Sequence, residues 1–370
     1  MKDFVVKNLV VQDVESELEK IGFDIAYRAK ASDKYRYKTL KIFNLTIPQA
    51  NILKQTALSL GADCAVHREV LTANVDKTDV ILGGSYSQLR KIADKLKFQP
   101  FSLKKLADII LDQLVLRKRN TKLVGILNIT PDSFSDGGLF FEPKQACERF
   151  YKLIEDGADM IDIGAESTKP FSEPVSAEEQ IERLKPLVKE FSNSSVPISI
   201  DTTSSIVANF ALDYGVKIIN DISGGNFDSK MFDTVSRYNA GIIIQHSTKK
   251  SEERPLYNDV VEEVYLDLLH KQNLAKECGI KNIILDVGIG FGKSKEENFE
   301  LLNRIEEFYS LEAPLMVGVS RKSLLGINSE DNDLKDSLSA AISYPLIQNG
   351  VDYLRVHNVK LNKQLVGLAI

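Results

Sequence analysis

The sequence predicts an α/β protein in which a (β/α)8 TIM barrel over residues 119–370 follows a small α/β domain over residues 1–118. Two observations predict the barrel. Apolar, strand-like runs recur eight times after residue 122, and amphipathic helical segments such as PVSAEEQIERLKPLVKEF at 174–191 separate them. Strands that are apolar on both faces and alternate with helices belong to a parallel sheet, and eight such units in about 250 residues match this barrel in number and length.

The N-terminal domain is predicted from shorter runs. In order, these are a strand near 38–45, a helix near 48–60, strands near 62–72 and 76–84, and helices at 86–97 and 103–116. This order fits a ferredoxin-like unit, and the basic segment RKRNTK at 117–122 is the expected hinge. The domain carries neither a Gly-rich phosphate loop nor a metal-ligand cluster, so its sequence does not indicate a role.

The strands expected in the barrel are Leu123–Ile129, Met160–Ala165, Ile198–Asp201, Lys217–Ile222, Gly241–His246, Ile283–Gly288, Leu315–Ser320 and Val351–Asn358. Polar residues stand at or near the end of each: Asn128, Glu166, Asp201, Asn220 with Asp221, His246, Asp286, Ser320 with Arg321, and Arg355 with His357. Such barrels carry their active sites at the carboxyl ends of the strands. Taken singly, each residue could instead cap a helix or form a turn.

Arg355 and His357 are harder to explain as caps, because both lie within one predicted strand. Their spacing of two residues places both side chains on the same face of that strand. In the last strand of a barrel, this face is either the interior or the mouth of the site. The pair therefore indicates a polar site rather than a turn.

The overall composition excludes several classes of protein. Hydrophobic residues make up 43% and charged residues 27% of the chain, as in globular proteins. The net charge of −5 gives no electrostatic argument for binding nucleic acid or an anionic membrane. No apolar run approaches the roughly 18 residues of a membrane span, and the first residues lack the pattern of a signal peptide. The three cysteines are widely spaced, so a reducing cytoplasm is the expected compartment.

The stretch LVGILNITPDSFSDGG at 123–138 joins a buried strand to a long polar loop. An ordinary turn needs two or three polar residues, whereas about ten follow this strand. Long loops inside compact domains are usually functional or disordered. We expect this loop to close over a reaction, with Gly137-Gly138 as a hinge and Phe134 as a wall that excludes water. Packing on the barrel rim is the alternative role for Phe134.

Several segments together closely resemble the signature of dihydropteroate synthase. They are LVGILNITPDSFSDGG, ADMIDIGAESTKP with EPVS shortly after it, SIDT, INDISGG, LDVGIGFGK, VGVSRKSLLG and LRVHNV, in this order over roughly 121–370. The first two are highly specific, whereas SIDT or INDISGG alone would be weak. The resemblance implies that the chain joins 6-hydroxymethyl-7,8-dihydropterin pyrophosphate to para-aminobenzoate, releasing pyrophosphate and forming dihydropteroate for folate synthesis.

The resemblance also implies roles for individual residues. Catalytic residues would be Asp201, Asp286, Lys322 and Arg355, and the pterin would contact these four together with Asn220. Carboxylates and a carboxamide suit a pterin edge that carries both hydrogen-bond donors and acceptors. Pyrophosphate would contact Asn128, Thr168, Arg355 and His357, and para-aminobenzoate would contact Phe134, Thr168, Lys169, Pro170, Phe291 and Ser323.

Magnesium is the expected cofactor, with Asn128 as its protein ligand by resemblance. A metal held mainly by diphosphate oxygens and water needs few protein ligands, so no dense acidic cluster is expected. The expected partners are the two small substrates and, by resemblance, a second copy of the chain in a homodimer. No nucleic acid or membrane partner is expected.

The chain departs from the family pattern at a few positions. The second loop has Lys169-Pro170-Phe171 where the family usually has Arg-Pro-Gly, and Asn358 replaces the usual aspartate after the last histidine. Val287 stands in place of a proline, and the methionine that usually follows His246 is absent. These changes affect the expected shape of the pocket rather than its main polar contacts.

Two other functions are compatible with parts of the pattern. A pterin-binding methyltransferase that uses methyltetrahydrofolate shares the barrel and the pterin edge. It would not need the serine-rich first loop or the anion-binding pair Arg355 and His357. A degenerate scaffold protein is the alternative of another class, and the retention of every expected polar residue argues against it.

Overall fold

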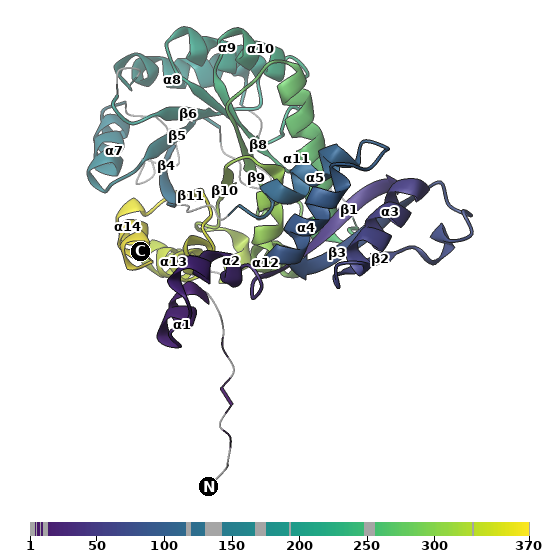
Figure 1. The fold of residues 1–370 in the computed structure, drawn as a ribbon. Helices are drawn as coiled ribbons and strands as arrows, with labels where there is room; N and C mark the ends of the chain where they lie inside the picture. Colours follow the sequence, from purple (N-terminus) through teal and green to yellow (C-terminus); the bar gives the residue numbers. More distant parts are fainter. Residues whose placement is uncertain are drawn as a thin grey trace. The chain divides into compact units, whose positions relative to one another are not determined.

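The computed structural model describes residues 4, 6–7, 9, 14–115, 120–129, 143–166, 175–191, 194–247, 256–327 and 329–369. The chain divides into two compact units, Met1–Arg117 and Lys118–Ile370. The first is drawn in purple to blue and the second in teal to yellow in Figure 1. Each unit has its own hydrophobic core and is described by itself.

The second unit is a closed barrel of eight strands in the order β10-β11-β4-β5-β6-β7-β8-β9, in which every neighbouring pair is parallel. This confirms the predicted TIM barrel. The strands are β4 (Lys122–Asn128), β5 (Met160–Gly164), β6 (Ile198–Asp201), β7 (Ile218–Asp221), β8 (Gly241–Gln245), β9 (Ile283–Asp286), β10 (Leu315–Val317) and β11 (Tyr353–Val356). All eight fall within the predicted runs or extend them by one residue.

Helices surround the barrel (Figure 1). They are α7 (Pro143–Glu155), α8 (Ala177–Phe191), α9 (Ser205–Asp213), α10 (Met231–Arg237), α11 (Val260–Glu277), α12 (Lys295–Asn303), α13 (Asn332–Gln348) and α14 (Val359–Leu368), with 3-10 turns η3 (Ile305–Leu311) and η4 (Ser323–Leu325). Side-chain caps explain several starts: Asp259 accepts hydrogen bonds from two backbone N–H groups of α11, and Asp331 does the same for α13.

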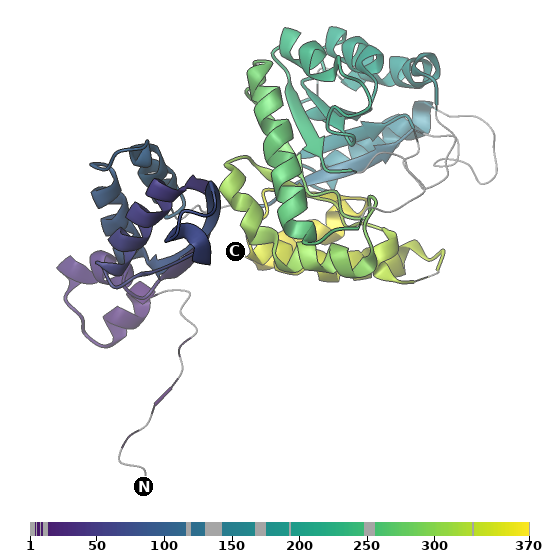
Figure 2. The same ribbon diagram turned by 90° about the vertical axis from the view of Figure 1, so that its right-hand side faces the viewer.

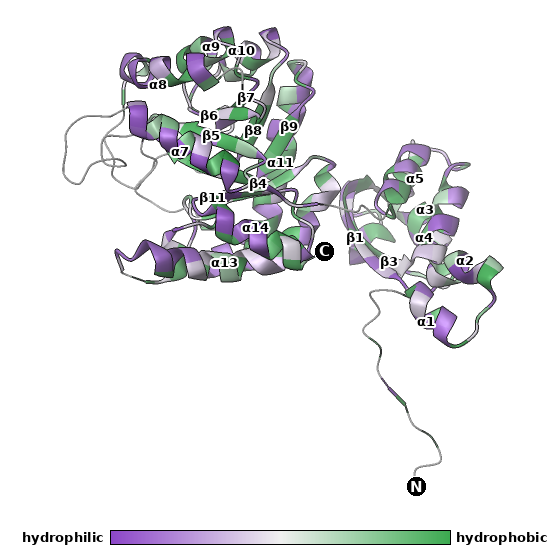
Figure 3. Cartoon of the chain, turned by 90° about the vertical axis from the view of Figure 1, so that its left-hand side faces the viewer, coloured by the Kyte–Doolittle hydropathy of each residue, from purple (hydrophilic) through white to green (hydrophobic). Residues whose placement is uncertain are grey.

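The barrel is stabilised by apolar side chains on both sides of its strands. A large core forms where the outward side chains of the strands pack against the helices, and it includes Leu123, Ile161, Ile200 and Leu268. A second, smaller cluster consists of Val124, Met160, Ile243 and Met316. Hydrophobic residues are concentrated on the strands, whereas the surrounding helices also carry polar residues (Figure 3).

The first unit is a three-stranded antiparallel sheet in the order β1-β3-β2, with helices packed on it (Figures 1 and 2). Its elements are α1 (Val14–Lys20), η1 (Ile25–Tyr27), α2 (Arg28–Ser32), β1 (Tyr37–Thr46), α3 (Ile47–Leu58), β2 (Asp63–Val66), η2 (Arg68–Val70), β3 (Lys77–Ser85), α4 (Tyr86–Leu96) and α5 (Leu103–Asp112). The strand order is that of a ferredoxin-like unit without a fourth strand among the described residues.

Two boundaries in this unit were predicted wrongly. The strand expected over 62–72 ends at Val66, because His67 caps the 3-10 turn η2 by accepting a hydrogen bond from the backbone of Glu69. The helix expected over 103–116 ends at Asp112. The helices α1 and α2 were not predicted.

Candidate functional site

Most of the sequence-predicted site residues that the structure describes lie at the carboxyl ends of the barrel strands. The pairing of β5, β6 and β7 sets Gly164, Asp201 and Asn220 side by side at one level. The next strands place Gln245 beside Asp286. Arg355 follows on β11, where it alternates with the buried Leu354 and Val356, so its side chain faces the interior. Closure of the barrel therefore gathers these polar groups from distant parts of the sequence.

Arg355 joins two carboxylates inside this end of the barrel. Its terminal guanidinium nitrogen lies 2.9 Å from Asp201 Oδ2, and its Nε lies 2.6 Å from Asp162 Oδ2. All three side chains are largely buried. Burial, and then the charge of Asp162, raise the pKa of Asp201 from 3.8 to about 7, while the Arg355 guanidinium acts in the opposite direction. Asp201 is thus poised to change charge near neutral pH.

Asp286 and Lys322 are two further buried groups at the site, and their charges act on each other. Burial raises the pKa of Asp286, and the nearby Lys322 acts in the opposite direction. Burial lowers the pKa of Lys322 to about 8, against the effect of Asp286. Lys322 Nζ donates to the carbonyl oxygen of Ile289 at 2.5 Å and lies 4.6 Å from the centre of the Phe291 ring.

The lysine reaches this position by passing close to Gly290, whose φ is +82°. A Cβ atom on Gly290 would lie 3.0 Å from Lys322 Cδ, and the positive φ would itself strain any other residue. Gly290 is therefore required both by the backbone turn and by the lysine. Ser323 follows Lys322 as the first residue of η4 and is exposed.

Asn128 lies at the end of β4 with its side chain half-buried against Gly164. A Cβ atom on Gly164 would lie 3.4 Å from Asn128 Oδ1 and 3.7 Å from Asp201 Cβ, so a glycine leaves room for both side chains. Within the described part of the chain, no group of three His, Cys, Asp or Glu side chains could hold a metal ion. Asn128 offers one neutral oxygen, which suits a metal whose other ligands are substrate oxygens and water.

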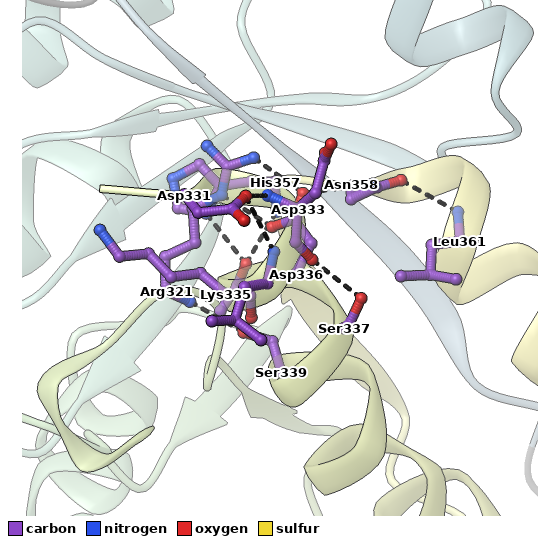
Figure 4. A network of polar contacts seen from close by, with 12 residues as sticks. Arg321, Asp331, Asp333, Lys335, Asp336, Ser337, Ser339, His357, Asn358 and Leu361 are labelled. Carbon is purple, nitrogen blue, oxygen red and sulfur yellow. Dashed lines mark hydrogen bonds and ion pairs between the residues drawn. The ribbon is translucent and has the colours of Figure 1, made fainter. Parts of the chain in front are cut away.

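His357 lies in a polar network near Asp336 and Asn358 (Figure 4). Its Nδ1 lies 3.0 Å from Ser320 Oγ, and its backbone carbonyl accepts a hydrogen bond from Arg149. Burial lowers the pKa of His357 to about 3, and the charges of Arg321 and Arg355 act in the same direction. In the free site His357 is therefore a neutral hydrogen-bonding group rather than a cation.

Asp336 on α13 connects the ends of β10 and β11. Its two oxygens accept hydrogen bonds from Arg321 at 2.7 and 2.8 Å, and one of them also accepts a hydrogen bond from Asn358 Nδ2 at 3.1 Å (Figure 4). Arg321 has a φ of +57°, which is unfavourable for a residue with a Cβ. The departure at Asn358 is explained here, because an aspartate would set a second carboxylate against Asp336.

Replacing Asp336 by Asn should lower kcat/KM by on the order of tenfold, because it releases the strained turn that precedes Lys322. Asp333→Asn is the matched control, since Asp333 lies one turn earlier on the exposed part of α13. Steady-state kinetics and thermal unfolding should be measured on both variants. Equal kinetics for the two variants would show that Asp336 does not hold the site.

Some predicted residues lie outside the described residues. They are Phe134 and the hinge Gly137-Gly138 in the first loop, and Thr168, Lys169, Pro170 and Phe171 in the second. Their predicted roles remain predictions.

Two site residues were missed by the sequence reasoning. Asp162 lies in the middle of β5, and a charged residue inside the apolar run MIDIG was an available signal. Lys293 is buried behind the loop that follows β9, where it donates to the carbonyl oxygens of Gly288 and Phe291 and lies 2.9 Å from His246 Nδ1. Lys293 thus shapes the loop that carries Phe291 and Gly290.

Comparison with known families and proteins gives consistent matches. The pterin binding enzyme family matches residues 124–357. A dihydropteroate synthase from Staphylococcus haemolyticus is 42% identical over 250 residues, covering 66% of this chain and 92% of that protein. The structure of dihydropteroate synthase from Clostridium difficile, determined in the presence of pteroic acid, superimposes with a TM-score of 0.64 and 35% identity, covering 69% of this chain and 98% of the other.

The first unit is matched as well in some relatives. A bifunctional dihydropteroate synthase/dihydropteroate reductase from Helicobacter pylori is 32% identical over 372 residues, covering 98% of this chain and 97% of that protein. A probable bifunctional folylpolyglutamate synthase/dihydropteroate synthase from Haloferax volcanii is 32% identical over 94% of this chain, which spans only 45% of that protein's length. Among the described helices, none combines the length and the apolar character needed to cross a membrane.

Proposed function

This chain belongs to the dihydropteroate synthase family, and we propose that it condenses 6-hydroxymethyl-7,8-dihydropterin pyrophosphate with para-aminobenzoate to form 7,8-dihydropteroate and pyrophosphate. The observation that carries this proposal is the set of buried polar groups at the strand ends, in which Asp201, Asn220 and Asp286 lie with Lys322 and Arg355. Acceptors and donors mixed in this way suit a pterin edge. The methyltransferase alternative has no support in the relatives described above, which are named as synthases.

The proposed reaction begins with lengthening of the bond between the pterin CH2 group and the diphosphate oxygen. The carbon then carries a positive charge that is delocalised over the ring. Asp201 and Asp286 lie in the same buried end of the barrel, where an ionised carboxylate strongly stabilises a developing cation. The amine nitrogen of para-aminobenzoate attacks this carbon, forms the new C–N bond and releases a proton, while the diphosphate leaves with the bonding electron pair.

Arg355 and His357 are proposed to contact the diphosphate, with Asn128 and the loop residue Thr168 beside it. Two donors of Arg355 are already bonded to carboxylates, so an anion would share this guanidinium with them. His357, neutral in the free site, would donate a hydrogen bond. Magnesium is proposed to bind with the diphosphate at Asn128 and to offset the negative charge of the leaving group.

Para-aminobenzoate is proposed to lie between Lys322 and the two loops. Of its proposed contacts, Phe291 and Ser323 flank Lys322 in the described structure. The others, Phe134, Thr168, Lys169 and Pro170, belong to the loops. Incubating the purified chain with both substrates and magnesium and measuring dihydropteroate by chromatography tests the activity. The proposed function would be contradicted if the folded protein bound neither substrate and formed no dihydropteroate.

A second activity is proposed for the first unit. The Staphylococcus relative, named only as a synthase, matches 66% of this chain, whereas the Helicobacter relative, named as both synthase and reductase, matches 98% of it. We propose that the first unit takes part in this second activity. Reduction of dihydropteroate would transfer a hydride from a reduced nicotinamide or flavin and a proton from solvent. The Haloferax relative matches 94% of this chain and is not named a reductase. The proposed reductase activity therefore has to be tested by measuring consumption of reduced nicotinamide.

Removing residues 1–118 should leave the synthase activity within about threefold of the full chain, because the described site residues all lie in the second unit and that unit has its own core. The same truncation should abolish any consumption of reduced nicotinamide with dihydropteroate as substrate. Both activities should be measured on the full chain and on the fragment 119–370. A folded fragment that binds both substrates without turnover would show that the first unit completes the synthase site.

A cytoplasmic homodimer is the proposed state of the protein. The three cysteines are free, Cys64 being buried, which is consistent with a reducing compartment. Light scattering of the full chain would test the dimer directly.

A further inference from the structure

Asp162 is a fully buried carboxylate for which the proposed mechanism gives no direct role. It lies one layer below the strand ends, in the middle of β5. Donors from three other strands meet it: Ser199 Oγ at 2.6 Å, Asn220 Nδ2 at 3.0 Å and Arg355 Nε at 2.6 Å. Each of these three contacts is a hydrogen bond that an oxygen of Asp162 accepts. Asp162 is therefore a fixed acceptor inside the barrel.

The orientation of the Asn220 amide follows from this contact. Asn220 Nδ2 and Arg355 Nε both donate to Oδ2 of Asp162, so the NH2 group of Asn220 faces Asp162 and its Oδ1 faces away. Asn220 Oδ1 is buried and has no hydrogen-bond partner in the described part of the chain. A buried acceptor without a donor is costly, which favours a ligand that supplies one.

The same carboxylate also holds Arg355. The guanidinium is placed between Asp162 below and Asp201 at the strand end, so its position depends on both. Asp162 thus sets the orientation of two proposed contact residues that lie on different strands, β7 and β11. Ser199, its third partner, bonds only the other oxygen of Asp162.

We propose that Asp162 is a positioning residue that makes Asn220 an obligate hydrogen-bond acceptor and holds Arg355 at the mouth of the barrel. The site then selects a heterocycle that presents an N–H donor to Asn220, as the amino-pyrimidinone edge of a pterin does. This inference deepens the proposed function and rests on it, because it assumes that the pterin occupies this end of the barrel.

Asp162→Asn tests the proposal, since it keeps the shape of the side chain and removes its charge. An asparagine offers both a donor and an acceptor, so Asn220 would no longer be held in one orientation. We expect the affinity for 6-hydroxymethyl-7,8-dihydropterin, measured by calorimetry, to fall by on the order of tenfold to a hundredfold. Asp221→Asn is the matched control, because Asp221 is equally buried and its carboxylate accepts hydrogen bonds from Ser223 and Gly225 of its own turn, with the charge of Lys271 acting on it.

The pH dependence of kcat/KM distinguishes a positioning role of Asp162 from a purely structural one. The charged groups that face Asp201 are Asp162 and Arg355, more weakly Asp221 and Glu166, and also Lys322, whose pKa the charge of Asp201 raises. Without the Asp162 charge, the rise of kcat/KM near neutral pH should move to lower pH, and Asp221→Asn should move it less. Two results would overturn the proposal. One is that Asp162→Asn binds the pterin within about threefold of wild type and has an unchanged pH profile of kcat/KM. The other is that Asp221→Asn loses as much pterin affinity as Asp162→Asn.

Wild-type protein offers a test that does not depend on the folding of a variant. Selective ¹⁵N labelling of asparagine, with Asn220→Asp to identify the signal, allows the side-chain NH2 of Asn220 to be followed by NMR. Adding 6-hydroxymethyl-7,8-dihydropterin should leave this NH2 group protected from exchange, with little change in shift, because it faces Asp162. A large shift typical of direct donation to the ligand would overturn the proposal. If wild-type protein neither binds the pterin nor forms product, the proposed function fails instead.

Discussion

Replacing Asp201 by Asn is expected to lower kcat/KM by on the order of 10²–10³, with little change in the fold. Asparagine keeps the shape of the side chain but removes the negative charge that would face the developing pterin cation. Asp201 is largely buried, so water cannot replace this charge. Steady-state kinetics with both substrates measure the effect.

The pH dependence provides a second signature of Asp201. Its pKa is raised to about 7, so the ionised form of the free enzyme accumulates as the pH rises through neutrality. Wild-type kcat/KM should therefore rise with pH near 7, whereas the profile of Asp201→Asn should lack this rise. A variant within about threefold of wild type at all pH values would show that the carboxylate takes no part in the reaction.

The stability of the protein should respond to pH in the opposite sense. The pKa of Asp201 is higher in the folded state than its ordinary value of 3.8, so the folded state binds the proton more tightly. The resulting contribution to stability is fully present below pH about 4 and is lost as the pH rises through about 7. The free energy of unfolding should be measured with denaturant at several pH values. Asp201→Asn should lack the part of the decrease between pH about 4 and 7 that Asp201 causes in wild type.

Replacing Arg355 by Ala should have the largest effect on stability as well as a strong effect on activity. It leaves Asp162 and Asp201 buried without their shared cation, and breaking a buried ion pair from one side typically costs about 3–5 kcal/mol. It also removes the proposed contact with the diphosphate. Calorimetry should show weaker binding of the pterin pyrophosphate and, to a smaller extent, of the unphosphorylated pterin.

A double variant separates these two effects. Adding Asp201→Asn to Arg355→Ala removes one of the two unpaired charges, so the double variant should be more stable to denaturant than Arg355→Ala alone. Its activity should not recover, because both proposed catalytic groups are then missing. If Arg355→Ala weakens binding of the pterin pyrophosphate and of the unphosphorylated pterin equally, then Arg355 stabilises the barrel and does not contact the diphosphate.

Local patterns in the sequence were enough to predict the barrel, its eight strands and the polar residues at their ends. These depend on local signals: apolar runs of strand length, amphipathic helices between them, and polar residues where each run stops. The first unit was predicted less accurately, since the strand expected over 62–72 is interrupted by a turn that His67 caps. Such a cap depends on one side-chain contact and leaves little trace in the pattern of apolar residues.

Which of these residues contact one another, and how their pKa values shift, became visible in the folded barrel. Asp162 looks like an isolated acid in an apolar strand until the barrel closes and brings it to Arg355, 193 residues later in the chain. The raised pKa of Asp201 and the lowered pKa values of Lys322 and His357 arise mainly from burial. Burial and long-range pairing are properties of the closed barrel, because they depend on which strands become neighbours and not on the residues beside each group in the sequence.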